Sequence, residues 1–282
     1  MNQLSVADRA KILTLLVEGN SINATCRITG AAKNTVLKLL ADVGEACVAY
    51  QDRVMRNLKC KKLQCDEIWA FCYSKQRSVP RNKRRVHGAG DVYTWTAIDA
   101  ETKLIPCWHI GTRDGESAKA FIDDLAPRMA TRVQLTTDGL KAYLAPVEYA
   151  FGANVDYAML VKLYGPAPGS AQERRYSPAE CCGSIKGTVC GNPKESDIST
   201  SHVERANLTM RMGMRRFTRL TNGFSKKLEN HMHAVSLHFM HYNFCRIHKT
   251  LRVTPAMEAK IDDHVWTMEE VVMMADTNSP SD

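Results

Sequence analysis

The order of strand-like and helix-like segments after residue 63 is the feature that most constrains the fold of this chain. Runs rich in β-branched and aromatic residues occupy 63–73, 91–99 and 103–110, and the short gap between the last two is typical of a hairpin. Helical and strand patterns then alternate. These later elements are expected as a helix at 116–126, a strand at 132–137, a helix at 140–150 and a strand at 155–163.

The next segment, 164–200, carries four prolines and five glycines without periodicity, which indicates a loop or an insertion. Two long helices are expected after it, at 201–216 and 226–247. Three antiparallel strands, helix, strand, helix, strand, insertion and helix is the order of an RNase H-like core. We therefore expect an α/β (α+β) fold in which 63–257 form a mixed-sheet domain, with the insertion before the helix at 201–216.

The first 43 residues predict three short helices. Ser5 and Ser21 are suited to cap the first two, and Gly30 follows the second in a tight turn. Two short helices joined by a glycine-containing turn are typical of a helix-turn-helix, so 1–45 is interpreted as a DNA-binding domain and 46–62 as a basic linker. The third helix, expected over 31–41, would enter the major groove N-terminus first. Its exposed opening residues would be Lys33, Asn34, Thr35 and Lys38. A three-helix protein-binding domain is the alternative.

The charge distribution also favours a polyanionic partner. The chain has 38 basic and 30 acidic residues, a net charge of +8. Segments 50–90 (11 basic, 3 acidic) and 200–255 (10 basic, 2 acidic) each carry +8, whereas the tail 258–282 (1 basic, 7 acidic) carries −6. Neither an apolar run long enough for a membrane span nor a secretory signal is recognisable. The ten scattered cysteines form no CxxC pair, so we expect free thiols in a cytoplasmic protein.

Three acidic residues stand where the expected fold would bring them together. Asp66 lies within the first strand, Asp138 at the end of the fourth, and Glu204 in the first turn of the helix after the insertion. Carboxylates are the natural ligands of Mg²⁺, and two such ions can stabilise the attacking and leaving oxygens of a phosphodiester. Asp99 and Asp114 are rival candidates, which we interpret as a hairpin residue and a helix-start residue. Glu67 should point to the opposite face of its strand.

One spacing supports the assignment of Glu204. Arg211 lies seven residues further along the same expected helix, which brings it back to within about 20° of the same face. A cation there could hold a DNA phosphate beside the reacting bond.

Five sequence stretches resemble transposases of the insertion-sequence-1 family. They contain Gln64-Cys65-Asp66-Glu67-Ile68-Trp69, Thr94 to Asp99, Gln134 to Tyr143, Ser199 to Arg211, and Tyr242 to Ala256. The resemblance covers about 60–257. It implies a DDE triad at Asp66, Asp138 and Glu204. The best-known members carry an N-terminal zinc finger and are often split into two reading frames. This chain differs from them, and we expect a single-frame type with a helix-turn-helix and no N-terminal zinc finger. The resemblance also implies cut-and-join chemistry, in which water frees a 3′-OH at each element end and that 3′-OH attacks target DNA.

The resemblance and the charge pattern together define the expected site and partners. Asp66, Asp138 and Glu204 would be the catalytic residues and would hold two Mg²⁺ (or Mn²⁺) ions. The partner would be double-stranded DNA, as terminal inverted repeats and target, bound by a homodimer or higher oligomer of a prokaryotic, nucleoid-associated protein. The DNA-binding residues expected besides those of the helix-turn-helix are Arg84, Arg85, Arg211, Arg215, Arg216, Arg219, Tyr242, Asn243, Arg246 and Lys249. A catalytically inactive transposase-derived DNA-binding protein or repressor is the alternative function, and a nuclease that cuts without joining is a third.

Overall fold

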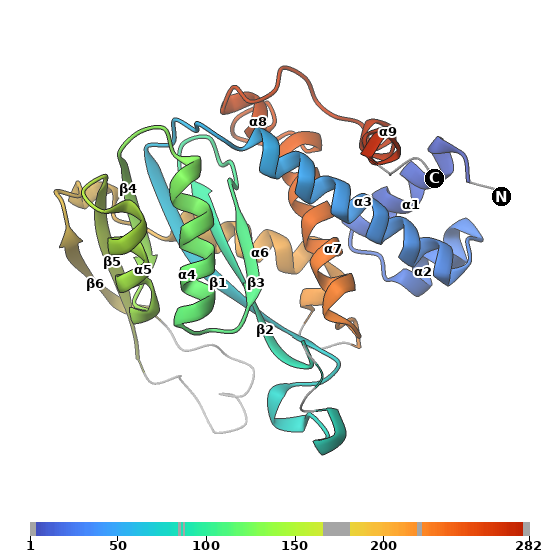
Figure 1. Ribbon diagram of the computed structural model, residues 1–282, viewed down its shortest axis with the longest axis horizontal. Coiled ribbons are helices and arrows are strands. Elements are labelled where there is room, and N and C mark those ends of the chain that lie inside the picture. Colours follow the sequence, from blue (N-terminus) through green and yellow to red (C-terminus); the bar gives the residue numbers. More distant parts are fainter. Residues whose placement is uncertain (1–3, 84–85, 87, 166–180, 219–221, 279–282) are drawn as a thin grey trace.

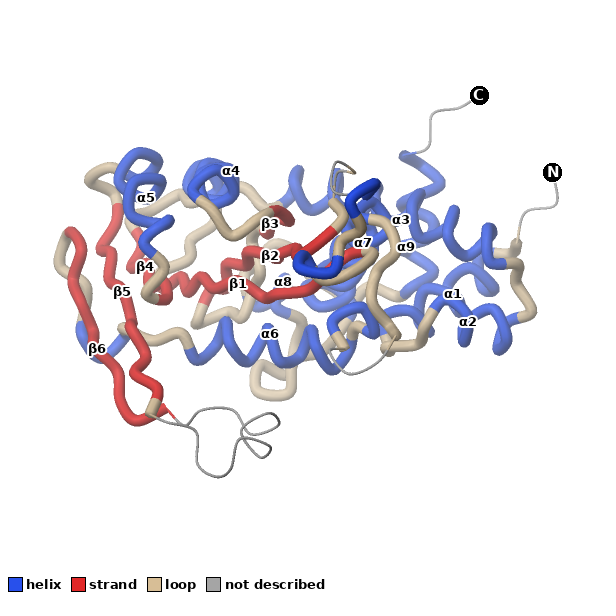
Figure 2. The backbone as a smooth tube through the Cα atoms, turned by 90° about the horizontal axis from the view of Figure 1, so that it is seen from below, coloured by secondary structure: helices blue, strands red, loops and turns tan. Residues whose placement is uncertain are grey.

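The computed structural model describes residues 4–83, 86, 88–165, 181–218 and 222–278. The protein is a mixed α/β structure in which a six-stranded sheet is joined to a helical region formed by both ends of the chain (Figure 1). Helices α4 (Gly115–Leu125) and α5 (Leu144–Phe151) cover one face of the sheet, and α6 (Ser201–Gly213) lies across the other (Figure 2).

The sheet has the strand order β3-β2-β1-β4-β5-β6. Its strands are β1 (Lys62–Cys72), β2 (Gly90–Asp99), β3 (Trp108–Gly111), β4 (Val133–Asp138), β5 (Val155–Tyr164) and β6 (Cys181–Cys190). The β1–β4 and β4–β5 pairs are parallel, and the other pairs are antiparallel. The central strand β1 therefore lies beside the strand that ends in Asp138.

Two strand predictions need correction. The third strand begins at Trp108 rather than at 103, because Pro106 cannot donate to a β ladder and Lys103 has a positive φ of 62°. The expected insertion 164–200 contains β6, which pairs with β5 at the edge of the sheet. Most of β6 is exposed and it carries Gly183 and Gly187, so it lacks the apolar alternation that marks a strand in sequence.

The helix-start signals of the sequence are present in the structure. Ser5, Ser21 and Asp114 accept hydrogen bonds from the backbone N–H three residues on, at the starts of α1 (Val6–Val17), α2 (Ile22–Thr29) and α4. Gly30 ends α2 with a φ of 72°. The remaining helices are α3 (Lys33–Val54), α7 (Leu228–Met240), α8 (Pro255–Glu258) and α9 (Met268–Asn278).

Helix α3 is much longer than predicted, and this changes the expected domain boundary. It continues without a break past residue 45 and includes 46–54, so the first half of the expected linker 46–62 is helical. Gly44, which favours a break, is instead required by packing. A Cβ on Gly44 would lie 2.6 Å from the Cβ of His233 on α7. Tertiary packing thus overrides the weak helix propensity of glycine.

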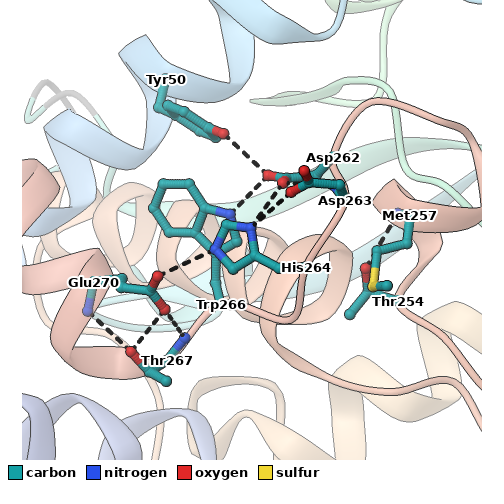
Figure 3. A network of polar contacts seen from close by, with 9 residues as sticks. All are labelled: Tyr50, Thr254, Met257, Asp262, Asp263, His264, Trp266, Thr267 and Glu270. Carbon is teal, nitrogen blue, oxygen red and sulfur yellow. Dashed lines mark hydrogen bonds and ion pairs between the residues drawn. The ribbon is translucent and has the colours of Figure 1, made fainter.

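The expected acidic tail 258–282 contains α9, which packs against α1. Arg9 of α1 makes two hydrogen bonds, of 2.6 and 2.8 Å, to the carboxylate of Asp276. Just before α9, Asp262 accepts hydrogen bonds from the indole of Trp266 and the hydroxyl of Tyr50 (Figure 3). The C-terminal segment is therefore attached to α1 and α3.

A single large hydrophobic core joins these regions. It includes Leu13 of α1, Leu40 of α3, Leu135 of β4 and Val271 of α9, all at most 1% exposed. A second cluster, around Ile68 and Phe239, lies between the sheet and the α6–α7 side. All ten cysteines lie in the described residues and are free, as expected. No helix in the described part of the chain has the length and apolarity that a bilayer crossing requires.

Candidate active site

Alternation along β1 directs two neighbouring carboxylates to opposite faces of the sheet. Asp66 faces α6, where it accepts a 2.8 Å hydrogen bond from the side-chain amide of Asn207. Glu67 faces α4 and α5, and its carboxylate accepts from the hydroxyl of Tyr143. The sequence prediction that Glu67 points to the other face is therefore confirmed.

The start of α6 is fixed by a buried side chain of the same strand. The side-chain oxygen of Gln64 accepts hydrogen bonds from the backbone N–H groups of His202 (2.8 Å) and Val203 (3.2 Å). A helix N-terminus has unpaired N–H donors, so this contact satisfies two of them and ties α6 to β1. Glu204 lies in the first turn of α6 and is held in place by this attachment.

Asp138 joins the site from the end of the neighbouring strand. The last register pair of the parallel β1–β4 ladder is Cys65 with Thr137, so Asp66 and Asp138 come next on the two strands. The Asp138 carboxylate accepts a 2.9 Å hydrogen bond from the N–H of Leu140 and a 3.3 Å hydrogen bond from Arg113. Three acidic and three basic residues line the resulting cleft of about 670 Å³: Asp66, Asp138, Glu204, Arg113, Lys162 and Arg211.

Glu67 reaches this site although it lies on the opposite face from Asp66. One carboxylate oxygen from each of Asp66, Glu67 and Asp138 lies within 4.8 Å of the other two. Arg113 bridges the group, because its guanidinium donates to Glu67 at 3.1 Å and also to Asp138. Glu67 is only 1% exposed as a side chain. The carboxylates are thus concentrated at the end of β4.

Two carboxylates of this group have raised pKa values. Burial, followed by the charge of Asp138, raises the pKa of Asp66 to about 6 and that of Glu67 to about 7. Both shifts mean that an added cation would be favourable, since it would offset the mutual repulsion of the carboxylates. The donor set consists of hard oxygen ligands and therefore fits Mg²⁺ or Mn²⁺.

Glu204 lies in the same cleft but has different partners. Its carboxylate pairs with the ammonium of Lys162 on β5 and accepts a 2.6 Å hydrogen bond from the hydroxyl of Thr200. It does not belong to the group of three carboxylates within 4.8 Å of each other. The rival candidates have structural roles, as predicted: Asp99 bonds to Thr102 in the hairpin, and Asp114 caps α4.

The predicted DNA-binding residues other than Arg216, Tyr242 and Asn243 fall into three groups. Arg216 is half-buried and donates a hydrogen bond to the hydroxyl of Ser225. Lys33, Asn34, Thr35 and Lys38 are exposed at the start of α3, and Arg215, Arg246 and Lys249 are exposed elsewhere. Arg211 lines the acidic cleft. Arg84, Arg85 and Arg219 lie outside the described residues.

Two residues predicted to contact phosphate have partners within the protein instead. Asn243 is fully buried, where its amide bonds to the backbone of Ile105 on both sides. The hydroxyl of Tyr242 donates to the carbonyl of Lys103 at 3.1 Å. Both residues fasten the end of α7 to the segment before β3. They were predicted as phosphate contacts because they belong to the Tyr242 to Ala256 stretch of the family resemblance, and nothing in the local sequence marks the contact with the segment before β3.

Three residues of the site were missed by the sequence analysis. Glu67 was set aside on the basis of alternation, and Arg113 and Lys162 carry no motif of their own. A carboxylate beside Asp66 was a visible signal for Glu67. The approach of Lys162 depends on strand pairing, and that of Arg113 on the packing of α4, so neither could be recognised from spacing.

No protein-family model matches the sequence, and no curated protein matches it. Among solved structures, the chain is similar to piggyBac transposase in a synaptic complex with hairpin DNA, at 11% identity and a TM-score of 0.40. That match covers 98% of this chain and 73% of the other. It is also similar to Mos1 transposase in a paired-end complex with the left transposon end, at 10% identity and a TM-score of 0.21. That match covers 56% of this chain and 60% of the other.

Proposed function

We propose that the protein is a DNA transposase of an insertion sequence, with an RNase H-like catalytic core of the DDE type. The observation that carries the proposal is the position of Asp66, Asp138 and Glu204 on one cleft. They come from a central strand, the end of its parallel neighbour and the first turn of a helix. Cationic side chains in the same cleft suit a phosphodiester substrate.

The carboxylates supply the metal-binding part of the site. Asp66 and Asp138 would hold Mg²⁺ or Mn²⁺, with Glu204 completing the triad and Glu67 close to both aspartates. Bound divalent ions would stabilise the negative charge on the attacking and leaving oxygens of the phosphodiester.

The chain's own residues orient the acids and bind the DNA. Asn207 fixes the carboxylate of Asp66 by a hydrogen bond, and Gln64 fixes the helix that carries Glu204. Arg211 and Lys162 offer positive charge to the DNA backbone beside the carboxylates. The exposed start of α3 would bind the terminal inverted repeats in the major groove as the recognition helix of a helix-turn-helix. Because two ends are processed together, a homodimer or higher oligomer on DNA is proposed.

A strand-transfer assay tests this function directly. Purified protein, Mg²⁺ and labelled DNA from the regions flanking its gene are incubated with a target plasmid. The wild type should give new 3′-OH ends joined to the target, and Asp138→Asn and Glu204→Gln should abolish both cleavage and joining. Asp123→Asn is the matched control, since Asp123 is a solvent-accessible carboxylate on α4 paired with Lys119.

Metal binding gives an independent readout. Electron paramagnetic resonance of Mn²⁺ should show binding to the wild type and to Asp123→Asn, and at least tenfold weaker binding to Asp138→Asn. DNA binding without cleavage in all variants would contradict the enzyme and leave a DNA-binding protein or repressor. Cleavage without joining would leave a nuclease.

A further inference from the structure

A second cleft lies between the N-terminal helices and the segment that follows α6. It has a volume of about 360 Å³ and is separate from the acidic site. Five basic residues line it: Lys33, Arg215, Arg216, Lys226 and Lys227. No acidic side chain is among the described residues that line it. The positive charge of this basic cleft is therefore not neutralised by acidic side chains among its described lining residues.

One of these cations is half-buried without a counter-ion. Arg216 donates a 3.0 Å hydrogen bond to the hydroxyl of Ser225, and it has no ion pair with any described carboxylate. Burial lowers the pKa of the Arg216 guanidinium to about 10. A buried guanidinium is costly unless a negative charge accompanies it. The missing charge is an indication that an anion belongs in the basic cleft.

Three helices begin at the same cleft, and two of them bring a lysine to it. Ser21, Ile22 and Asn23 at the start of α2 line it, as do Lys33 at the start of α3 and Lys227 at the start of α7. Neither α3 nor α7 has a side-chain cap, so none of their N-terminal N–H groups is satisfied by a capping side chain. Helix N-termini of this kind bind phosphate groups through backbone N–H donors and the helix dipole.

The basic cleft also lies between the two proposed functional regions. Helix α6 carries Glu204 in its first turn and ends at Gly213. There it meets the α1–α2 turn, where a Cβ on Gly19 would be 3.3 Å from the Gly213 carbonyl oxygen. From Glu204 to its last residue Gly213, α6 rises about 14 Å. That is about four phosphates of one DNA strand.

We propose that the basic cleft binds the DNA backbone between the helix-turn-helix and the acidic site, holding one or more phosphates with Arg216, Lys226 and Lys227. This inference rests on the proposed function, because it takes DNA as the partner. It adds that DNA held by α3 is anchored at the junction with α6, about four nucleotides from the phosphodiester that reacts.

Equilibrium DNA binding in the presence of EDTA tests the basic cleft without any catalysis. The affinity for a fluorescein-labelled 30-base-pair duplex is measured by anisotropy over a range of salt concentrations. Lys226 and Lys227 are exposed, so the double variant K226Q/K227Q should fold normally. It should bind about 60-fold more weakly at 0.1 M salt, and the slope of log K against log salt should fall by about 1.8. K186Q/K194Q, which removes two exposed lysines on and after β6, is the matched control and should leave both unchanged.

Arg216→Met supplies a second measurement. Its melting temperature in phosphate-free buffer should equal or exceed that of the wild type, because the half-buried guanidinium without a counter-ion is gone. The duplex and inorganic phosphate should each stabilise the wild type more than Arg216→Met.

The remaining outcomes separate the two proposals. A K226Q/K227Q variant with the affinity and salt slope of the control would overturn the proposal that the basic cleft binds DNA. It would leave the proposed transposase function unaffected. Stabilisation by inorganic phosphate alone, with DNA binding unaffected by both variants, would also overturn it, in favour of a free-anion site. A wild type that binds no duplex at any salt concentration would overturn DNA as the partner and hence the proposed function.

Discussion

At the scale of single residues, burial decides which polar groups are available for function. His231 is fully buried, with one ring nitrogen bonded to the hydroxyl of Ser225, and His238 is 5% exposed. Burial lowers the pKa of both histidines to about 3. Their ring nitrogens Nε2 of His231 and Nδ1 of His238 have no hydrogen-bond partner among the described residues. Both rings are therefore neutral packing groups at neutral pH.

The two histidines predict a pH dependence of stability. Their folded-state pKa values lie below the unfolded value of about 6.5, so each stabilises the fold above pH 6.5 and loses this contribution as the pH falls towards 3. The slope is about 1.4 kcal/mol per pH unit for each histidine. Urea unfolding at pH 7.5, 6.0 and 5.0 should show a smaller rise of stability with pH in His231→Gln and His238→Gln than in the wild type.

The comparison with the wild type is necessary because other groups act in the opposite direction. Asp66 and Glu67 have raised pKa values, so their contribution is present at low pH and is lost as the pH rises. The same holds for the exposed His264, whose pKa is raised by Asp263 and its other acidic neighbours. His264→Gln should therefore steepen the rise of stability with pH. Equal slopes in all proteins would contradict the burial argument.

At the scale of helices and strands, local sequence signals were sufficient to predict where helices begin and which side chains of a strand share a face. Ser5, Ser21 and Asp114 begin helices as predicted, and the alternation along β1 separates Asp66 from Glu67. The same signals did not reveal where α3 ends, because α7 packs over Gly44 and extends the helix. They also missed β6, whose stability comes from pairing with β5 rather than from an apolar pattern. Features set by contacts distant in sequence were the ones that sequence alone could not predict.

The close contact between α3 and α7 at Gly44 predicts that an alanine there destabilises the protein. Gly44→Ala improves helix propensity by about 1 kcal/mol, but its Cβ would lie 2.8 Å from the Cα of His233, so the two helices must separate. Overpacking of this kind costs about 1–3 kcal/mol, and the variant should be destabilised overall. Gly115→Ala at the start of α4 is the control, since its Cβ would meet nothing within 4 Å. Thermal unfolding should show a lower midpoint for Gly44→Ala only. An unchanged or raised midpoint would show that α3 and α7 can separate at this position without loss of stability.

At the scale of the whole molecule, the N-terminal helices and the sheet share one hydrophobic core. Leu13 and Leu40 belong to the same cluster as Leu135 and Val271. The sequence suggested separate domains joined by a linker, which would allow the N-terminal helices to unfold alone. A shared core instead predicts that they unfold together with the sheet.

Hydrogen exchange in increasing urea concentrations measures this cooperativity. The slowest amides of α1–α3 and those of β1 and β4 should lose protection at the same urea concentration. Leu13→Ala should lower that concentration for both regions, at a cost of about 3 kcal/mol, because it leaves a cavity in the shared core. Ile28→Ala, at a side chain that is 52% exposed, should leave both unchanged. Loss of protection in α1–α3 alone would show that the sheet does not depend on them.

The pairing of α1 with α9 has a consequence for synthesis of the chain. The residues joined by the Arg9–Asp276 ion pair are 267 positions apart in the sequence. Helix α1 therefore cannot pack against α9 until those 267 residues have been synthesised. At ordinary elongation rates of 5–20 residues per second, that delay is roughly 13–50 s. During translation, the N-terminal helices are therefore incompletely packed until the sheet and α9 have been synthesised. A nascent chain thus completes its N-terminal helical region only after all residues of the acidic cleft have been made.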